Sequence, residues 1–320
     1  MTTPPPSGSA TTQATAGPTR KVLLGLGEAS WDEFSELRQW PKRGSKVPAR
    51  GRHSAPGGQV ATALAAAQGL GVATRLVAVV GDDDQGEALE AAMQRSGVEA
   101  HLTRISGART RGAQIFVEAD GERTIIEHRD PACRIDPATL DVEGLMTNVA
   151  ALHLDATQPA AARVMAEEAR RRGIWVSADL DTLDNEEVLA PLLASVDHLV
   201  VSEHVAQELS STPAQTLEAL APRCAPEATV GITLGIRGSL LRLSTGELLE
   251  TAAYRVEVRD TTGCGDVFRG ALLAARLSGA PWSAALEEAS AAAALAATAL
   301  GAQGALATRV DLDALVQRGV

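Results

Sequence analysis

Apolar and polar positions alternate between two periodicities from residue 21 onward. Short apolar runs, each long enough for a buried strand, lie at 21–27, 73–81, 151–155, 174–181, 198–202 and 229–235. Stretches with apolar residues at helical spacing lie between them, at 59–71, 84–97, 159–173 and 203–209, and two alanine-rich helices are expected after Gly263. Glycines such as Gly97 mark the ends of the predicted helices.

This alternation predicts the fold class. Strands separated by helices of about ten to fifteen residues form βαβ units, which give a mostly parallel sheet with helices on both faces. We therefore expect an α/β protein. In such sheets ligands bind beyond the carboxyl ends of the strands. Acids follow several predicted strands, and although each alone is commonly a cap or turn residue, together they predict a polar pocket: Asp32, Asp155, Asp179 and Asp181.

Two segments, 30–55 and 108–130, interrupt this alternation and have an extended pattern. The second contains ADGER at 119–123, a good hairpin turn between strands of alternating polarity. We expect both segments to project from the parallel sheet as a small antiparallel sheet that acts as a lid. No internal repeat or second core pattern is visible, so residues 21–320 are predicted to form one domain with this lid.

Composition limits the possible partners. The 320 residues carry a formal net charge of −11 and only 2% are aromatic, which argues against nucleic acid and against an anionic membrane surface. No apolar run reaches the roughly 18 residues of a membrane span. Residues 1–20 are rich in Pro, Ser, Thr and Gly, so we expect a disordered tail rather than a signal peptide or an anchor.

Three cysteines, Cys133, Cys224 and Cys264, lie far apart and match no metal-ligand spacing, and neither do the six histidines. A sparse, odd set of cysteines favours a reducing cytoplasm over a disulfide scaffold. Cys264 stands at a predicted helix start, where thiol pKa values fall. A reactive thiol is one interpretation there, and a small residue in a tight turn is the one we favour. His153, close to Asp155, is a candidate to line the pocket.

The stretch DTTGCGDVFRGALLAARL at 260–277 is the strongest candidate for chemistry. Gly263, Cys264 and Gly265 form a turn in front of a predicted helix, and Asp266 lies where that helix begins. An acid at such a place can be a simple cap. The glycines, however, let the backbone approach a ligand closely, and amide groups at a helix start bind anions. An anion site beside a carboxylate indicates phosphoryl transfer.

Four segments resemble the motifs of the ribokinase-like (PfkB-type) carbohydrate kinases, in the order that this family has them. They are DTTGCGDVFRGAL and the stretches at 57–86, 233–241 and 301–309. The resemblance runs from about residue 21 to the end of the chain. It implies a three-layer α/β/α domain with a mostly parallel central sheet and a small β lid. Shorter stretches, such as GERTIIEH at 121–128 and HLDAT at 153–157, are most similar to ketohexokinase and related ketose or sugar-acid kinases.

The resemblance also implies roles for residues at matching positions. Asp266 would be the general base for the acceptor hydroxyl, and the amide groups of Gly263, Cys264 and Gly265 would stabilise charge on the transferring phosphoryl group. Residues implied to bind the acceptor are Asp32, Gly57, Gly58, Gln59, Thr62, Arg123 and Asp155. Residues implied to bind the nucleotide are Ser202, Thr233, Gly235 and Gly238. A monovalent-cation site is implied at Asp260, Thr262 and carbonyls near Ala296 and Gly301.

The chain departs from the family pattern at several of these positions. Thr62 stands where the family usually has Asn, and Ser30 where Asn is frequent. Shorter side chains there predict a roomier pocket or contacts to different hydroxyls. The family's Asn-x-x-Glu motif, tied to metal and phosphates, is replaced by Ser-Glu-His-Val at 202–205, and Glu203 is a weaker candidate for the missing glutamate.

The function implied is an ATP-dependent carbohydrate kinase that phosphorylates a hydroxyl of a small sugar or sugar derivative. It implies ATP and Mg²⁺, with K⁺ as the candidate for the monovalent site, and we expect a cytoplasmic homodimer that pairs through the lid. Three alternatives remain: a nucleoside kinase of the same fold, a non-catalytic sugar-binding homologue, and a capped helix without chemistry. A dinucleotide-dependent oxidoreductase is disfavoured, because GLGEAS at 25–30 lacks the third glycine of that fingerprint.

Overall fold

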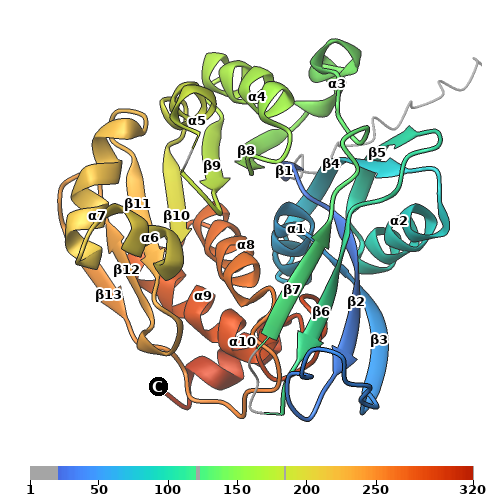
Figure 1. Cartoon of the computed structure of the whole chain (residues 1–320). Helices are drawn as coiled ribbons and strands as arrows, with labels where there is room; N and C mark the ends of the chain where they lie inside the picture. Colours follow the sequence, from blue (N-terminus) through green and yellow to red (C-terminus); the bar gives the residue numbers. More distant parts are fainter. Residues whose placement is uncertain (1–20, 120–122, 184, 320) are drawn as a thin grey trace, which may run out of the picture.

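The structure is a computed structural model that describes residues 21–119, 123–183 and 185–319. It has a large sheet covered by helices and a second, smaller sheet beside it (Figure 1). The predicted tail at 1–20 and the centre of the predicted hairpin turn, 120–122, lie outside the described residues. In the part of the chain that is described, no helix is both long and apolar enough to cross a membrane.

The large sheet has nine strands in the order β13-β12-β11-β10-β9-β8-β1-β4-β5. Pairing from β5 through β1 and β8 to β11 is parallel, and β12 and β13 add an antiparallel hairpin at one edge. The strands are β1 (Val22–Leu26), β4 (Ala73–Gly81), β5 (Glu99–Ile105), β8 (Val149–Leu154), β9 (Trp175–Asp179), β10 (His198–Ser202), β11 (Thr229–Thr233), β12 (Ser239–Arg242) and β13 (Leu248–Thr251). The predicted α/β class is confirmed.

Strand β1 shows why the inner parallel strands are continuous apolar runs. All five of its residues are buried. Leu23 packs into the core cluster that includes α1 and α8, whereas Leu24 and Leu26 pack into the cluster on the opposite face. Because helices cover both faces, neither face of such a strand needs polar residues.

Helices cover the two faces in sequence blocks. One face carries α1 (Gln59–Gly69), α2 (Asp84–Ser96), α8 (Cys264–Leu277), α9 (Trp282–Ala296) and α10 (Arg309–Val316). The other carries α3 (Val142–Leu145), α4 (Pro159–Arg171), α5 (Glu186–Leu193), α6 (Glu203–Leu209) and α7 (Pro213–Leu220). The strand order of the sheet reverses between β1 and β8. Such a switch point is where open α/β sheets bind ligands.

Small residues let α1 lie close to both β1 and α8. A Cβ on Gly25 of β1 would come within 2.5 Å of Val60, and a Cβ on Gly270 of α8 would lie 2.1 Å from the Ala63 carbonyl oxygen. Any larger residue at these glycines would push the helix away. The start of α1 is thereby held next to the start of α8, which brings the two glycine-rich segments of the sequence together.

The second sheet has the strand order β3 (Gly51–Gly57), β2 (Ser30–Glu36), β6 (Gly112–Val117) and β7 (Arg123–His128). Pairs β2–β3 and β6–β7 are antiparallel, but β2 and β6 are parallel. The expectation of an antiparallel sheet is therefore wrong at its centre. The reason is that β2 follows β1 and β6 follows β5, so both strands leave the same end of the parallel sheet and run in the same direction.

The small core of the second sheet is formed by Phe34, Ile115 and Val117. Edge strand β7 is different, because all six of its residues are exposed, including Ile125 and Ile126. An exposed strand edge with two large apolar side chains is a surface that proteins commonly cover.

Candidate active site

The start of α8 has the geometry that the motif predicts. Gly263 is the N-cap residue and adopts a left-handed backbone conformation (φ +75°). A Cβ at this position would lie 2.5 Å from the Cβ of Ala302, so only glycine fits. No side chain of the described residues caps this helix end. Asp266 lies in the first turn with its side chain 19% exposed, next to amide groups that can bind an anion.

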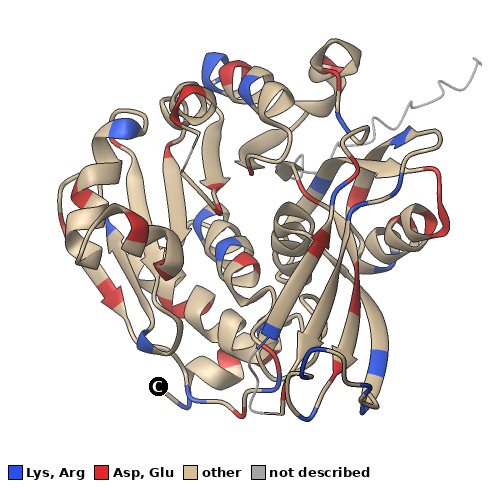
Figure 2. Cartoon of the chain, in the orientation of Figure 1, with Lys and Arg blue, Asp and Glu red and all other residues tan. Residues whose placement is uncertain are grey.

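Arg269 lies one turn further along α8 and connects three elements. Its guanidinium is buried and approaches Asp179 Oδ1 at 2.8 Å and Asp266 Oδ1 at 3.9 Å. It also donates to the Val200 carbonyl oxygen from Nε and Nη2, at 3.2 and 3.1 Å. A Cβ on Gly265 would lie 2.7 Å from Arg269 Nη1, so this glycine makes room for the guanidinium. Figure 2 shows charged residues of both signs along α8.

The charge balance around Asp266 determines its protonation. Burial and the neighbouring Asp179 carboxylate raise the pKa of Asp266 well above its usual value, while Arg269 lowers it. Burial also raises the pKa of Asp179, and the nearby Arg269 offsets only part of this rise. A carboxylate with a raised pKa is a stronger base, and so is better matched to removing a proton from a hydroxyl group.

Asp155 lies at the switch point, after β8, and its side chain is fully buried. One oxygen accepts from the Glu28 amide at 2.6 Å; the other accepts from the Thr157 amide at 2.8 Å and the Thr157 hydroxyl at 2.6 Å. The closeness of Gly27 to this carboxylate, where a Cβ would lie 2.4 Å from Oδ2, keeps the two loops together. Asp155 therefore fixes the loop after β1, and its predicted contact with the acceptor stays a prediction.

Glu28 is a site residue that sequence reasoning missed. Its carboxylate lies 2.7 Å from Arg111 Nε, and both side chains are largely buried. Burial raises the pKa of Glu28 to about 8, although Arg111 lowers it. The sequence signal is an acid two residues after the first strand, a position that Asp32, four residues later, matches less closely.

The predicted acceptor residues from the second sheet and α1 do come together. Ser30 and Asp32 of β2 lie opposite β3, where a Cβ on Gly57 would be 1.9 Å from Asp32 Oδ2. Asp32 Oδ1 accepts from the Ala113 amide at 3.0 Å, and burial raises the pKa of this carboxyl to about 6. Gly58 has φ +91° and lies against the backbone of Glu28.

Three further residues of the acceptor set have distinct surroundings. Gln59 begins α1 and is partly buried. Thr62 is fully buried and its hydroxyl accepts from Gln303 Nε2 at 3.4 Å. Arg123, at the start of β7, donates to the Thr261 hydroxyl. That contact joins the second sheet to the turn that precedes α8.

The predicted nucleotide residues lie at the ends of β10 and β11. Ser202 caps α6 by accepting from the Val205 amide at 3.4 Å. Thr233 ends β11, and the turn Gly235–Arg237 follows it. A Cβ on Gly238 would lie 1.8 Å from the Thr251 carbonyl oxygen, which explains this glycine. Glu203, the weaker candidate, forms an ion pair with Arg237 on that turn.

The predicted cation residues also meet. Asp260 is buried, and its Oδ1 accepts from the amide and hydroxyl of Thr262 at 2.9 and 2.7 Å. Its Oδ2 accepts from the Gly301 amide at 2.8 Å, and its own amide donates to the Ala297 carbonyl oxygen, one residue after Ala296. Whether a cation binds in this cluster stays a prediction.

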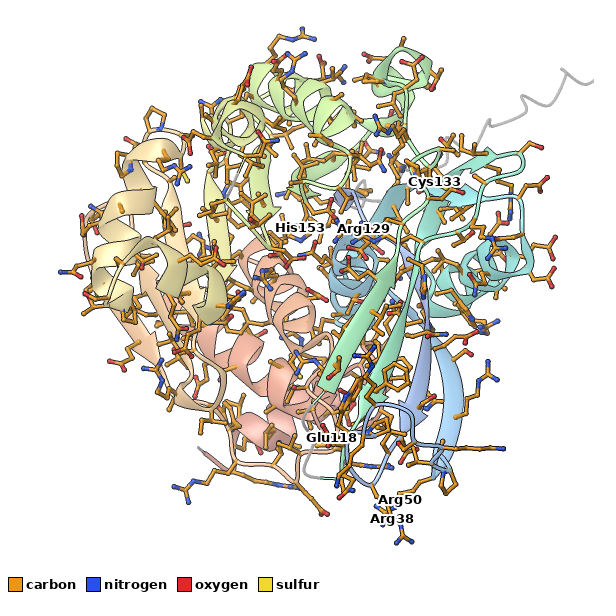
Figure 3. All side chains as sticks on the ribbon, viewed as in Figure 1. Arg38, Arg50, Glu118, Arg129, Cys133 and His153 are labelled. Atoms are coloured by element: carbon orange, nitrogen blue, oxygen red, sulfur yellow. The ribbon has the colours of Figure 1, made fainter. Side chains whose placement is uncertain are left out.

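Two other expectations concern titratable groups. Burial raises the pKa of Cys264 to about 12, so its thiol stays protonated, as the favoured interpretation of a small turn residue requires. His153, labelled in Figure 3, is fully buried, and its Nδ1 lies 3.2 Å from the Ser177 hydroxyl. Burial lowers the pKa of His153 to about 3. It is a neutral core residue and does not line the pocket as expected.

Comparison with known proteins decides the family. The sequence model described as "pfkB family carbohydrate kinase" matches residues 23–309, which is most of the chain. The chain belongs to the PfkB family of carbohydrate kinases.

The PfkB assignment agrees with individual relatives. The chain is 27% identical to the ATP-dependent ribose-1-phosphate kinase of Halopiger xanaduensis, over 88% of this chain and 94% of that protein. It is 29% identical to the ribokinase of Bacillus subtilis, over 91% and 98%. The structure of Arabidopsis thaliana ribokinase complexed with ribose and ATP is similar with a TM-score of 0.81, at 23% identity, covering 93% of this chain and 99% of that one.

Membership of the PfkB family confirms the resemblance on which the sequence analysis relied, and with it the fold and the enzyme class. The protein is a phosphotransferase of the ATP-dependent sugar kinase type. The relatives named here are kinases of ribose and ribose 1-phosphate, so similarity to the ketohexokinase branch is a minor feature beside the family match.

The raised pKa of Glu28 predicts a pH-dependent stability. Between its usual pKa of 4.5 and about 8, the folded protein keeps a proton on this carboxyl that the unfolded chain has lost. The free energy of unfolding therefore falls as pH rises through this range. Glu28→Gln removes that dependence, so the variant should gain stability relative to the parent between pH values of about 5 and 8.

The measurement is the melting temperature of both proteins across this pH range. Glu257→Gln, at an exposed position, is the control for loss of one carboxylate, and its difference from the parent should not depend on pH. A constant difference between the parent and Glu28→Gln at all pH values would contradict the raised pKa.

Proposed function

We propose that this PfkB-family enzyme transfers the γ-phosphoryl group of ATP to a hydroxyl of a small sugar or sugar derivative, with Asp266 as general base. The observation that carries the proposal is the position of Asp266 in the first turn of α8, directly behind the left-handed Gly263. The ribose and ATP bound by Arabidopsis ribokinase support the two substrate classes.

The protein itself contributes little covalent chemistry to this step. Asp266 removes the proton of the acceptor hydroxyl, whose oxygen forms a bond to the γ-phosphorus while the bond to the β,γ-bridging oxygen breaks and ADP leaves. Negative charge that develops on the transferring group is stabilised by amide groups of the turn Gly263, Cys264 and Gly265. Arg269 holds Asp179 and approaches Asp266, so it positions the base and adjusts its pKa.

The acceptor is proposed to lie between the second sheet and α1. Asp32, whose carboxylate faces the Gly57 position, accepts hydrogen bonds from acceptor hydroxyls, and Gly58 and Gln59 bring backbone close to it. Thr62 shapes the wall that a longer side chain would fill. Arg123 bonds to Thr261 beside the catalytic turn, which supports a lid that closes over the bound acceptor and excludes water.

ATP is proposed to bind along Ser202, Thr233, Gly235 and Gly238. Among the described residues, no group of three or more His, Cys, Asp or Glu side chains is arranged to hold a metal ion. This fits Mg²⁺ chemistry in kinases, because Mg²⁺ keeps several waters and is bound by substrate phosphates with one or two carboxylates. Asp181, which is exposed and close enough to raise the pKa of Asp266, is the carboxylate that would hold the metal. Bound there, Mg²⁺ would neutralise charge on the phosphates.

Residues 21–320 are proposed to act as one kinase domain whose lid comes from 30–55 and 108–130, and residues 1–20 as a tail outside it. All three cysteines are unpaired, which supports a reducing compartment such as the cytoplasm.

Asp266→Asn tests the mechanism. The change is nearly isosteric, so folding and ligand binding should persist, while kcat should fall by about 10²–10⁴-fold through loss of the base. Asp32→Ala should instead raise KM for the acceptor with a smaller effect on kcat. ADP release is measured over ketoses, aldoses, sugar acids and nucleosides. An Asn variant that turns over a good substrate as fast as the parent would overturn the mechanism, and activity on nucleosides alone would favour a nucleoside kinase.

Asp260 motivates a second test, of the proposed potassium site. A monovalent cation bound near Asp260 and Thr262 would order the turn that precedes α8, so activity should be higher in KCl than in tetramethylammonium chloride at equal ionic strength. Equal rates in the two salts would remove the site from the proposal.

Edge strand β7 motivates a test of the proposed homodimer. Ile125 and Ile126 are 44% and 45% exposed, so pairing of two lids would cover them. The mass in solution, measured by light scattering at micromolar protein, should be twice that of the chain. The double variant Ile125→Lys, Ile126→Lys should have the mass of one chain, whereas Val310→Lys, at an exposed site on α10, should not change it. A parent protein with the mass of one chain argues against the dimer.

A further inference from the structure

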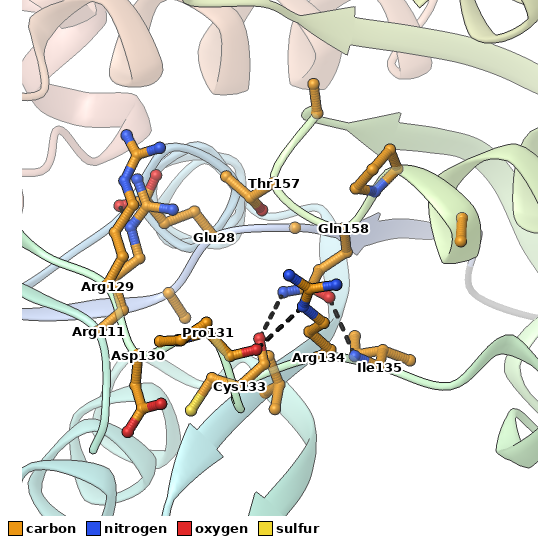
Figure 4. Close-up of a pocket in the computed structure, with 16 residues that line it drawn as sticks. Glu28, Arg111, Arg129, Asp130, Pro131, Cys133, Arg134, Ile135, Thr157 and Gln158 are labelled. Carbon is orange, nitrogen blue, oxygen red and sulfur yellow. Dashed lines mark hydrogen bonds and ion pairs between the residues drawn. The ribbon is translucent and has the colours of Figure 1, made fainter. Parts of the chain in front are cut away.

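A cavity of about 430 Å³ lies at the switch point, between the end of β1, the segment after β7 and the start of α4 (Figure 4). This volume is large enough for a small ligand or a substantial part of one. The polar residues that line it include Glu28, Arg111, Arg129, Arg134, Thr157 and Gln158. The functional roles assigned above use none of its three arginines.

The arginines are incompletely balanced by carboxylates. Arg111 pairs with Glu28 at 2.7 Å, and it shares Glu127 with Arg129. Arg134 donates from Nε to the Pro131 carbonyl oxygen at 2.9 Å, and within the described chain no carboxylate lies within ion-pair distance of it. Because burial raises the pKa of Glu28 to about 8, part of the negative charge opposite Arg111 is neutralised as well.

Asp130 also lines the cavity but does not balance this charge. Its two carboxylate oxygens accept from the amides of Arg109 and Ala132, each at 2.9 Å. Figure 4 shows this carboxylate pointing away from the arginines. The cavity therefore presents an excess of guanidinium groups.

The protein holds Arg134 against the start of α4. Gln158, the residue before this helix, accepts from the Ile135 amide at 3.0 Å and donates to the Cys133 carbonyl oxygen at 3.2 Å. Its side chain makes no cap on α4, and the first turn of the helix contains no acidic residue. The positive end of a 13-residue helix thus adds to the field of the arginines. Arg129 and Cys133 lie in the same segment, after β7 (Figure 3).

The cavity belongs to the acceptor side of the site. It adjoins β1 and β8, whereas the nucleotide residue Thr233 ends β11, three strands away from β8. With strands about 4.8 Å apart, that separation is about 14 Å. Glu28, in the wall of the cavity, is close enough to raise the pKa of Asp266. Arg111 and Arg129 are close enough to lower the pKa of Asp181.

We infer that this arginine-lined cavity binds an oxyanion carried by the acceptor, so that the natural acceptor is an anionic sugar, either a sugar phosphate or a sugar acid. The inference rests on the proposed phosphoryl transfer, and names the substrate class that it uses. Guanidinium groups bind phosphate and carboxylate through paired N–H donors. The uncharged part of the acceptor then extends from the cavity toward Asp32 and Asp266.

Arg134→Gln tests the cavity, because Arg134 is exposed at its rim and has no carboxylate partner to strand. Steady-state kinetics compare ribose with ribose 1-phosphate, ribose 5-phosphate and ribonate, and gluconate with glucose. We expect kcat/KM of the parent to be higher for one anionic class than for the neutral sugars. Arg134→Gln should raise KM for that class by about 10–100-fold, the loss typical of one hydrogen bond to a charged group, and leave KM for the neutral sugar unchanged.

Arg163→Gln is the matched control, because Arg163 lies on α4 and pairs with Glu167 at the surface; it should behave as the parent. The phosphate and carboxylate arms decide between the two oxyanions. Calorimetric binding of the same compounds to Asp266→Asn, without ATP, measures the cavity independently of turnover.

The two proposals fail in distinguishable ways. If neutral sugars are the best acceptors and Arg134→Gln equals the parent on every compound, the cavity inference is overturned while the kinase function stands. If no compound is phosphorylated but the anionic sugars bind to Asp266→Asn and lose affinity on Arg134→Gln, the cavity inference stands and the phosphoryl transfer is overturned.

Discussion

Burial of several carboxylates at one edge of a parallel sheet is the constraint on which the rest of the site depends. An ionised group in the interior costs free energy unless it is paired or hydrogen-bonded. Three sets of interactions offset this cost. Asp155 accepts hydrogen bonds from the backbone and from Thr157. Glu28 pairs with Arg111, and Asp179 and Asp266 share Arg269. The balance is incomplete, and as a result the pKa of Asp266 lies well above its usual value.

The fold was predictable wherever neighbouring residues determine the structure. Apolar runs predicted β1, β4 and the strands β8 to β11, because helices on both faces require apolar residues throughout. The parallel edge strand β5 was not predicted, because its residues are only partly buried and form no apolar run. The direction of β6 relative to β2 was not predictable in this way. It depends on which end of the large sheet each strand leaves, and that is a property of the whole topology rather than of the sequence within either strand.

The same distinction applies to the site. Gly263 and Asp266 are three residues apart, so the chain itself shows their relation, and a resemblance to the family could supply the role. Pairs such as Glu28–Arg111 and Asp179–Arg269 join residues far apart in the chain, and no local pattern marks them. Asp155 shows a further limit: the chain does not reveal that this carboxylate accepts hydrogen bonds from Glu28 and Thr157, and its contact with an acceptor stays a prediction.

The second sheet and the segment after it place all three arginines of the cavity between residues 111 and 134, in one continuous stretch. The turn at 263–265 and Arg269 lie in another stretch, 260–277. Substitutions that accumulate in the first stretch leave the packing of α8 on α1 untouched, since different residues support it. The two stretches can therefore change separately: residues 111–134 can alter the lining of the cavity while the turn before α8 keeps its packing.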